Sequence, residues 1–169
     1  MASGSSAHSG DFALQRRALL DALRKNRLIT ERSLRAMDRV PREAFVDPEL
    51  RDRAYEDSAL PIGEGQTISQ PTVVGIMTSA LEVRPNSHIL EIGTGSGYQA
   101  AVLARLGKSV VSIELVESLV ERARKVLDSL GIDNVEVHHS DGSLGWPDAA
   151  PYDRIIVTAA APSVPEVLL

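Results

Sequence analysis

Hydrophobic residues along this chain follow two periodicities in turn, and their alternation predicts strands separated by helices. Four apolar runs of strand length lie at 89–92, 109–114, 135–139 and 154–158. Over 99–106 and 116–130 the apolar residues instead recur every three or four positions, as they do on one face of a helix. Strands that alternate with helices predict an α/β fold with a parallel, doubly wound sheet.

The first part of the chain predicts helices. Residues 12–25 have an amphipathic helical pattern, and Thr30 is a suitable N-cap for a second helix over 31–38. Pro41 and Pro48 then interrupt regular structure, and Gly63 and Gly65 predict a flexible loop. A third helix should begin at Pro71; its apolar face is formed by Val73, Val74, Ile76, Met77, Ala80 and Leu81.

Composition narrows the classes of partner. The 169 residues are 43% hydrophobic and carry a net charge of −5, which argues against nucleic acid as the main partner. Cysteine is absent and the four histidines have no metal-ligand spacing, so we expect no metal site. No apolar run approaches the length of a membrane span, and the default expectation is a cytoplasmic protein without membrane contact.

A glycine-rich turn follows the first predicted strand of the sheet. Residues 88–98 read H-I-L-E-I-G-T-G-S-G-Y, with Gly93, Gly95 and Gly97 at alternate positions. A strand that passes through such a turn into a helix brings backbone N–H groups and a helix N-terminus close to a ligand. Glycine is needed because a Cβ would hold the ligand away, although similar turns also serve only to reverse the chain.

Two acids stand at the ends of the next two strands. Glu114 ends the second strand, 21 residues after Gly93, where a carboxylate can accept hydrogen bonds from ribose hydroxyls. Asp141 and Gly142 follow the third strand, where the carboxylate can accept from an adenine amino group. Either acid alone is most simply a solvated loop residue. Their placement at successive strand ends predicts a nucleotide site.

Ser69 allows two interpretations. It stands just before the helix that begins at Pro71, and capping such a helix is the commonest task of a serine. Alternatively, the hydroxyls of Thr67 and Ser69 and the helix start bind a carboxylate. Spacing alone leaves both open.

Several motifs carry a resemblance to a known family. The G-x-G-x-G spacing, with Glu91 in the preceding strand, resembles the first motif of S-adenosylmethionine-dependent methyltransferases; a dinucleotide fingerprint would have glycine where Tyr98 stands. The stretches G-E-G-Q-T-I-S-Q-P, I-L-E-I-G-T-G-S-G-Y-Q-A-A-V-L-A, S-D-G-S-L-G-W and Y-D-R-I-I-V-T-A-A-A-P closely resemble the protein-L-isoaspartate O-methyltransferase family, over 28–169.

The resemblance implies a Rossmann-like methyltransferase fold, S-adenosyl-L-methionine as cofactor, and isoaspartyl-containing proteins and peptides as partners. Their free L-isoaspartyl carboxylate would receive the methyl group, which begins repair to aspartate. Ser69 would be the active-site serine, and Thr67, Ser69, Thr158 and Ala159 would bind substrate. The implied cofactor contacts are Gln66, Thr67, Ile68, Ser69, Glu91, Gly93, Gly95, Gly97, Glu114, Asp141 and Gly142.

We therefore expect a disordered tail over 1–10, a helical region with the active-site loop over 11–81, and an incomplete Rossmann-like cofactor domain over 82–169. The family continues past this chain's last residue with further strands, so we expect a fragment that self-associates through the apolar run at 155–157. Two rival functions remain open: a methyltransferase acting on a small molecule or RNA, and a truncated, non-catalytic domain.

Overall fold

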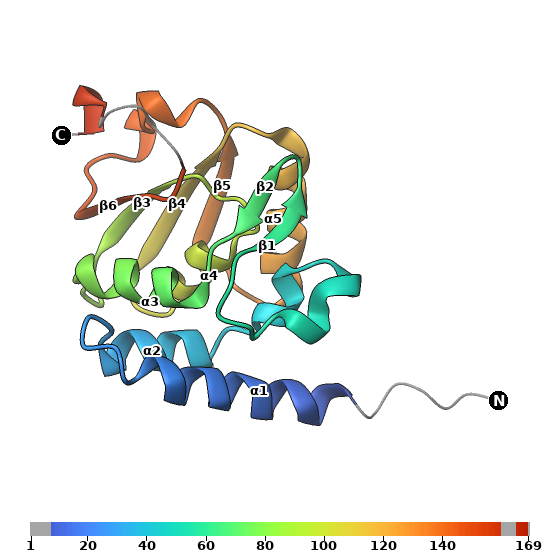
Figure 1. Cartoon of the computed structure of the whole chain (residues 1–169). Coiled ribbons are helices and arrows are strands. Elements are labelled where there is room, and N and C mark those ends of the chain that lie inside the picture. The colour runs from blue at the N-terminus through green and yellow to red at the C-terminus, as the bar shows by residue number, and fades with distance from the viewer. Residues whose placement is uncertain (1–7, 160–164, 169) are drawn as a thin grey trace.

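A four-stranded parallel sheet in the order β5-β4-β3-β6 forms the centre of the structure, a computed structural model in which residues 8–159 and 165–168 are described (Figure 1). The strands are β3 (His88–Ile92), β4 (Ser109–Glu114), β5 (Val135–His139) and β6 (Arg154–Val157). The sequence predicted all four of these strands and their parallel arrangement, and both are confirmed.

The two faces of the sheet pack against different parts of the chain, because successive side chains of a strand point to opposite faces. Leu90 and Ile92 of β3, together with Val111 and Ile113 of β4, pack against Trp146, Ala149, Tyr152 and Leu168. That second face is covered by the 3-10 turns η3 (Gly142–Leu144), η4 (Pro147–Ala149) and η5 (Glu166–Leu168). The opposite face carries Ile89, Val110, Val137 and Ile156, and it belongs to the larger core.

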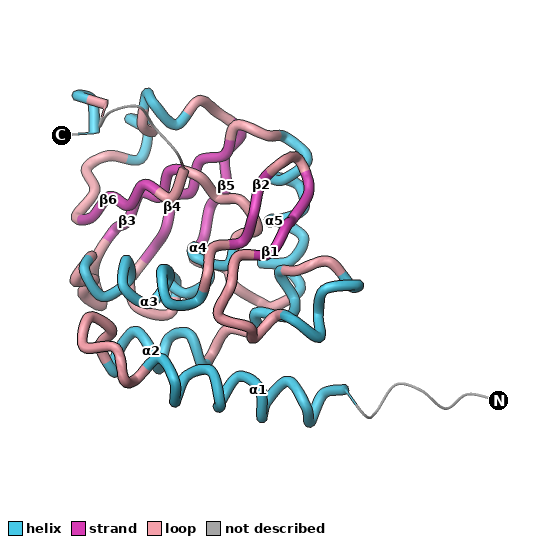
Figure 2. Tube along the Cα trace, in the orientation of Figure 1, coloured by secondary structure: helices cyan, strands magenta, loops and turns pink. Residues whose placement is uncertain are grey.

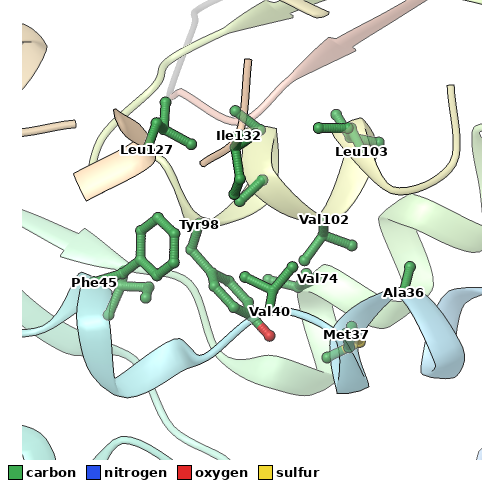
Figure 3. Close-up of a cluster of buried hydrophobic side chains, with 14 of the residues drawn as sticks. Ala36, Met37, Val40, Phe45, Val74, Tyr98, Val102, Leu103, Leu127 and Ile132 are labelled. Carbon is green, nitrogen blue, oxygen red and sulfur yellow. The ribbon is translucent and has the colours of Figure 1, made fainter. Parts of the chain in front are cut away.

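The larger core joins the sheet to the helices. Every residue of α4 (Tyr98–Ala104) is buried, and the Tyr98 ring meets Phe45 edge-on at 5.6 Å (Figure 3). Leu127 from α5 (Glu117–Ser129), Val74 from α3 (Pro71–Ala80) and Met37 from α2 (Glu31–Asp38) lie in the same cluster. The N-terminal helices and the sheet therefore share one continuous core.

The N-terminal helices differ in part from the expectation. The second is confirmed as α2, and the Thr30 hydroxyl accepts a hydrogen bond from Ser33 N at 3.2 Å as its cap. The first, α1 (His8–Leu23), begins within the tail predicted over 1–10 and ends two residues early; residues 1–7 lie outside the described residues. Short 3-10 helices η1 (Arg42–Phe45) and η2 (Pro48–Arg53) follow the prolines. Within the described part of the chain, none of the helices combines the length and apolarity needed to span a bilayer.

The predicted flexible loop around Gly63 is wrong. Residues on either side form an antiparallel hairpin of β1 (Leu60–Gly63) and β2 (Gln66–Ile68), seen as two short magenta strands in Figure 2. Its tip docks on α5, where the Ser118 hydroxyl donates to Glu64 at 3.0 Å and the Arg122 guanidinium donates to the Ile62 carbonyl at 2.9 Å. Tertiary contacts thus give this segment a defined shape.

Candidate functional site

A cavity of about 430 Å³ lies where the strands of the sheet end. Its walls come from the β2–α3 connection, the glycine turn after β3, the end of β4, the loop after β5 and the end of β6. Most of the residues predicted for the site line it: Gln66, Thr67, Ile68, Ser69, Gly93, Gly95, Glu114, Asp141, Gly142, Thr158 and Ala159.

The glycine turn is held by its neighbours on both sides. The N–H groups of Gly93 and Thr94 donate to the Ile113 carbonyl at 2.8 and 3.2 Å, which ties the turn to β4. Gly93 has φ of +100°, and a Cβ there would lie 2.9 Å from the Ala159 nitrogen. Only glycine fits such a conformation and such a close approach without strain, so the turn can bring its backbone up to a ligand.

Glu114 is buried at the end of β4 and braces the same turn. One carboxylate oxygen accepts from Gly95 N at 2.8 Å, and the other accepts from Val116 N at 3.0 Å. An ionised carboxylate has about four lone-pair sites, so both oxygens retain capacity for a hydroxyl donor. Glu114 therefore fits the predicted ribose contact and, in addition, shapes the glycine turn.

Asp141 and Gly142 close the opposite wall. The Asp141 carboxylate accepts from Ser143 N at 2.9 Å, and this bond holds the pKa of Asp141 below its usual range. A Cβ on Gly142 would come within 2.4 Å of Ile92 Cγ2, so the loop after β5 lies directly against the end of β3. A charged acceptor is thus held at the cavity wall.

Thr158 also has a structural task. Its hydroxyl contacts the carbonyls of Ile92 and Gly93 at 3.0 and 2.6 Å, and its N–H donates to the Ile92 carbonyl at 2.9 Å. Its hydroxyl hydrogen is therefore directed to the backbone of the glycine turn. Thr158 lines the cavity mainly as a brace for that turn, and Ala159 beside it is exposed.

Ser69 is not the cap of α3. The cap position belongs to Gln70, whose side chain makes no capping bond. The carboxylate of Asp57 instead accepts from Thr72 N at 2.8 Å and from the Thr72 hydroxyl at 2.6 Å. Among the described residues the Ser69 hydroxyl has no hydrogen-bond partner, and Ser69 lies half-buried in the cavity wall. Of the two interpretations of Ser69, the geometry favours a hydroxyl directed to a ligand.

Two residues predicted as cofactor contacts do not line the cavity. Glu91 points to the helix-covered face of the sheet, where it is fully buried and accepts from the Ser112 hydroxyl at 2.6 Å. Burial raises the pKa of Glu91 to about 8 against that hydrogen bond, and the charge of Glu114 adds to the rise. Gly97 begins α4 and packs against α5, where a Cβ would lie 3.2 Å from Ala123 Cβ. Both residues support the glycine turn from behind.

Other residues of the site carried no recognised signal in the sequence. Gln99 is buried in the cavity wall, and its amide donates to the Thr78 hydroxyl at 2.9 Å. Leu115 lines the cavity while 67% exposed, and its place directly after Glu114 was an available signal. Asp57 acts from outside the cavity, across 15 residues of sequence, and no local pattern reveals it.

Solved structures with the same fold define the class of this protein. One protein-L-isoaspartate O-methyltransferase matches 90% of this chain and half of its own, at 34% identity and a TM-score of 0.82. A Plasmodium falciparum protein, described as an enzyme of the same name in complex with S-adenosyl-L-homocysteine, has a TM-score of 0.79 at 24% identity; the match covers 90% of this chain and 77% of that protein. The fold is thus the Rossmann-like methyltransferase fold, with its cavity at the carboxyl ends of the strands.

The family follows from the sequence match. Residues 14–169 match the model of the protein-L-isoaspartate(D-aspartate) O-methyltransferase family, and the chain belongs to that family. The Salinibacter ruber protein-L-isoaspartate O-methyltransferase is 56% identical over 92% of this chain and 67% of its own length. A Pelobacter propionicus relative is 60% identical over 80% of this chain and 60% of its own length. The chain therefore spans only about three fifths to two thirds of these relatives.

Proposed function

We propose that this protein transfers a methyl group from S-adenosyl-L-methionine to the free carboxylate of L-isoaspartyl residues in damaged proteins and peptides. Family membership supports the reaction class. The observation that carries the proposal is the Ser69 hydroxyl, which lines the cavity while α3 is capped by Asp57. A hydroxyl donor that is not consumed by the helix can bind a carboxylate.

The proposed reaction asks little chemistry of the protein's own residues. A carboxylate has an unperturbed pKa of about 4 and is ionised at neutral pH, so it needs no general base. Alignment of the substrate oxygen is then the main task, and positioning of this kind lowers a barrier by several kcal/mol, on the order of 7 or more in favourable cases. Ser69 would orient the carboxylate by donating a hydrogen bond, and Thr67 would lie beside it in the same wall.

The residues of the cavity fit the proposed cofactor. Glu114 and Asp141 are acids, and none of the described residues lining the cavity is Lys or Arg. Such a wall suits a ligand with a sulfonium and an ammonium group, whereas a pyrophosphate needs cationic or helix-dipole partners. Glu114 would hold the ribose hydroxyls, Asp141 the adenine amino group, and Gly93 and Gly95 would bring the backbone close. S-adenosylmethionine, when bound, supplies the electrophilic methyl group.

We further propose that the reaction takes place in the cytoplasm, on proteins and peptides, without nucleic acid or membrane partners. The net charge of −5 supports this choice of partner, since a phosphate backbone or an anionic lipid surface would be repelled.

Matched peptides test the proposed function. Radiolabelled methyl transfer should be measured with an isoaspartyl peptide and with its aspartyl twin of the same sequence. The isoaspartyl peptide should accept methyl groups and the aspartyl peptide should not. Calorimetry should detect binding of S-adenosylhomocysteine. Binding of NAD without binding of S-adenosylhomocysteine would overturn the cofactor assignment, and equal methylation of both peptides would overturn the substrate.

A further inference from the structure

The start of α3 needs hydrogen-bond acceptors that its own sequence could supply. The first N–H groups of a helix have no partner within the helix, and a nearby Ser, Thr, Asp or Asn side chain usually accepts from one of them. Pro71 has no N–H, so Thr72 carries the first N–H of α3. Ser69 stands three residues before Thr72, the spacing at which an N-cap serine accepts from the N3 nitrogen. By local rules Ser69 is the natural acceptor.

Asp57 takes that place from a separate loop. Its two carboxylate oxygens accept from the nitrogen and the hydroxyl of Thr72, at 2.8 and 2.6 Å. Although partial burial opposes the change, these bonds hold the pKa of Asp57 below its usual range. A negative charge at a helix N-terminus is also favourable in itself. The acceptor that α3 requires is therefore supplied without the Ser69 hydroxyl.

A second group outside the segment fixes Ser69 by its main chain. The Ser69 carbonyl accepts from Arg42 Nη2 at 2.8 Å, and the fully buried guanidinium is itself held by the Ala54 carbonyl at 2.8 Å and stacked over the Tyr98 ring at 4.9 Å. Arg42 thus anchors Ser69, while Asp57 anchors Thr72. The backbone between these two anchors is fixed, and the Ser69 hydroxyl is directed to the cavity wall.

We infer that Asp57 is a positioning residue for the substrate carboxylate: by capping α3 from outside the helix, it keeps the Ser69 hydroxyl available to the substrate. This inference rests on the proposed function of Ser69. Without Asp57, the Thr72 N–H has no acceptor, and Ser69 is the nearest side chain with the right spacing to provide one. Ser69 would then turn from the cavity to the helix, and the substrate would lose its donor.

A double-mutant cycle tests the inference. Asp57→Ala, Ser69→Ala and the double variant should be compared for the Kd of an isoaspartyl peptide, for KM and kcat, and for the Kd of S-adenosylhomocysteine. Thr30→Ala is the matched control, because it removes the cap of α2, which accepts from Ser33 N at 3.2 Å, without touching the cavity. Asp57→Asn keeps an acceptor for Thr72 N, since Asn is an equally good cap.

Asp57→Ala should weaken peptide binding roughly tenfold or more, as much as Ser69→Ala does, which is the scale of one hydrogen bond to a charged group. The double variant should be no weaker than either single variant, because both changes remove the same contact. Affinity for S-adenosylhomocysteine should stay unchanged, Asp57→Asn should recover most of the peptide affinity, and Thr30→Ala should lower the melting temperature alone.

Two results separate the inference from the proposed function. If the unsubstituted protein binds no isoaspartyl peptide, the proposed function fails and the inference falls with it. If that protein binds the peptide but Asp57→Ala binds it equally well, or if the losses of Asp57→Ala and Ser69→Ala add in the double variant, the positioning role of Asp57 alone is overturned.

Discussion

Glu91 carries a buried carboxyl group whose second oxygen has no hydrogen-bond partner among the described residues. Ser112 donates to the first oxygen, and Thr94 of the glycine turn contacts Ser112 at 2.6 Å. A hydrogen-bonded chain therefore links the floor of the sheet to the turn. Since burial raises the pKa of this carboxyl group to about 8, the proton on Glu91 affects the free energy of folding.

We predict that Glu91→Gln makes stability less dependent on pH. The folded state keeps the Glu91 proton up to about pH 8, whereas the unfolded chain releases it near the model value of 4.5. The folded state thus binds more protons between these values, and the free energy of unfolding falls as pH rises through that window. The loss should be about a few kcal/mol in total. Glutamine cannot titrate, so Glu91→Gln should match the parent near pH 5 and exceed it near pH 8.5.

Urea unfolding across pH 5 to 9 would measure the effect, on the parent, on Glu91→Gln and on the exposed Glu121→Gln as control. A parent and a Glu91→Gln variant with the same pH slope would show that Glu91 is ionised in the fold.

For Glu114 we predict a loss of cofactor affinity. Glu114→Ala should weaken S-adenosylhomocysteine binding by about 1–3 kcal/mol, because it removes a charged acceptor and frees the N–H groups of Gly95 and Val116. Calorimetry measures the change, with Glu117→Ala as a control on the exposed side of the same region. Equal affinities in parent and Glu114→Ala would remove Glu114 from the cofactor site.

At the scale of elements, the glycines of the turn divide their tasks. Gly97 has φ of +88° and faces Ala123 of α5 at 3.2 Å, whereas Gly95 has φ of +53° and would place a Cβ 3.6 Å from Ile62 Cδ1. We predict that Gly97→Ala lowers the free energy of unfolding by about 1–3 kcal/mol, through strain and crowding between α4 and α5.

Gly95→Ala should cost less stability and more cofactor affinity, because Gly95 lines the cavity and Gly97 does not. Urea unfolding and calorimetry on both variants give the comparison. If Gly97→Ala weakened binding while leaving stability intact, Gly97 would belong to the ligand contacts implied by the family resemblance.

The elements that the sequence predicted are those formed by local patterns. The α2 helix with its Thr30 cap and the strands β3 to β6 follow from periodicity and from short-range capping, which act within a few residues. The β1–β2 hairpin was missed because its tip places Glu64 in a left-handed conformation with φ of +53°, held by a contact with Ser118. A partner 54 residues away leaves no local signal.

The site follows the same division. Gly93, Gly95, Glu114 and Asp141 were predicted because strand ends in a parallel sheet meet at one edge, and they do line one cavity. Whether Ser69 caps α3 depends on Asp57, which arrives from another loop, so spacing alone left the two interpretations even. Glu91 was placed at the cavity by resemblance, yet the pleat of β3 turns it to the other face.

At the scale of the whole molecule, β6 is the strand whose environment is least complete. Among the described residues it pairs with β3 only, and Ile155 and Val157 are half-buried. Thr158 N donates to Ile92 in β3 at 2.9 Å. Because alternate residues of a strand turn their N–H groups to opposite sides, the N–H groups of Ile155 and Val157 point away from β3. Unpaired donors beside apolar side chains favour pairing with another strand.

We therefore predict that a polypeptide of these 169 residues self-associates through β6 as its concentration rises. Ile155→Pro should suppress this association and leave the fold intact, because proline removes an outward N–H and is tolerated on an edge strand. Ile156→Pro is the matched control: its N–H points to β3, so the substitution breaks a bond of the sheet and should destabilise the fold. Sedimentation velocity over a range of concentrations, together with thermal unfolding, separates the two variants. A parent that stays monomeric at every concentration, or an Ile155→Pro variant that associates as strongly as the parent, would show that β6 is not the contact.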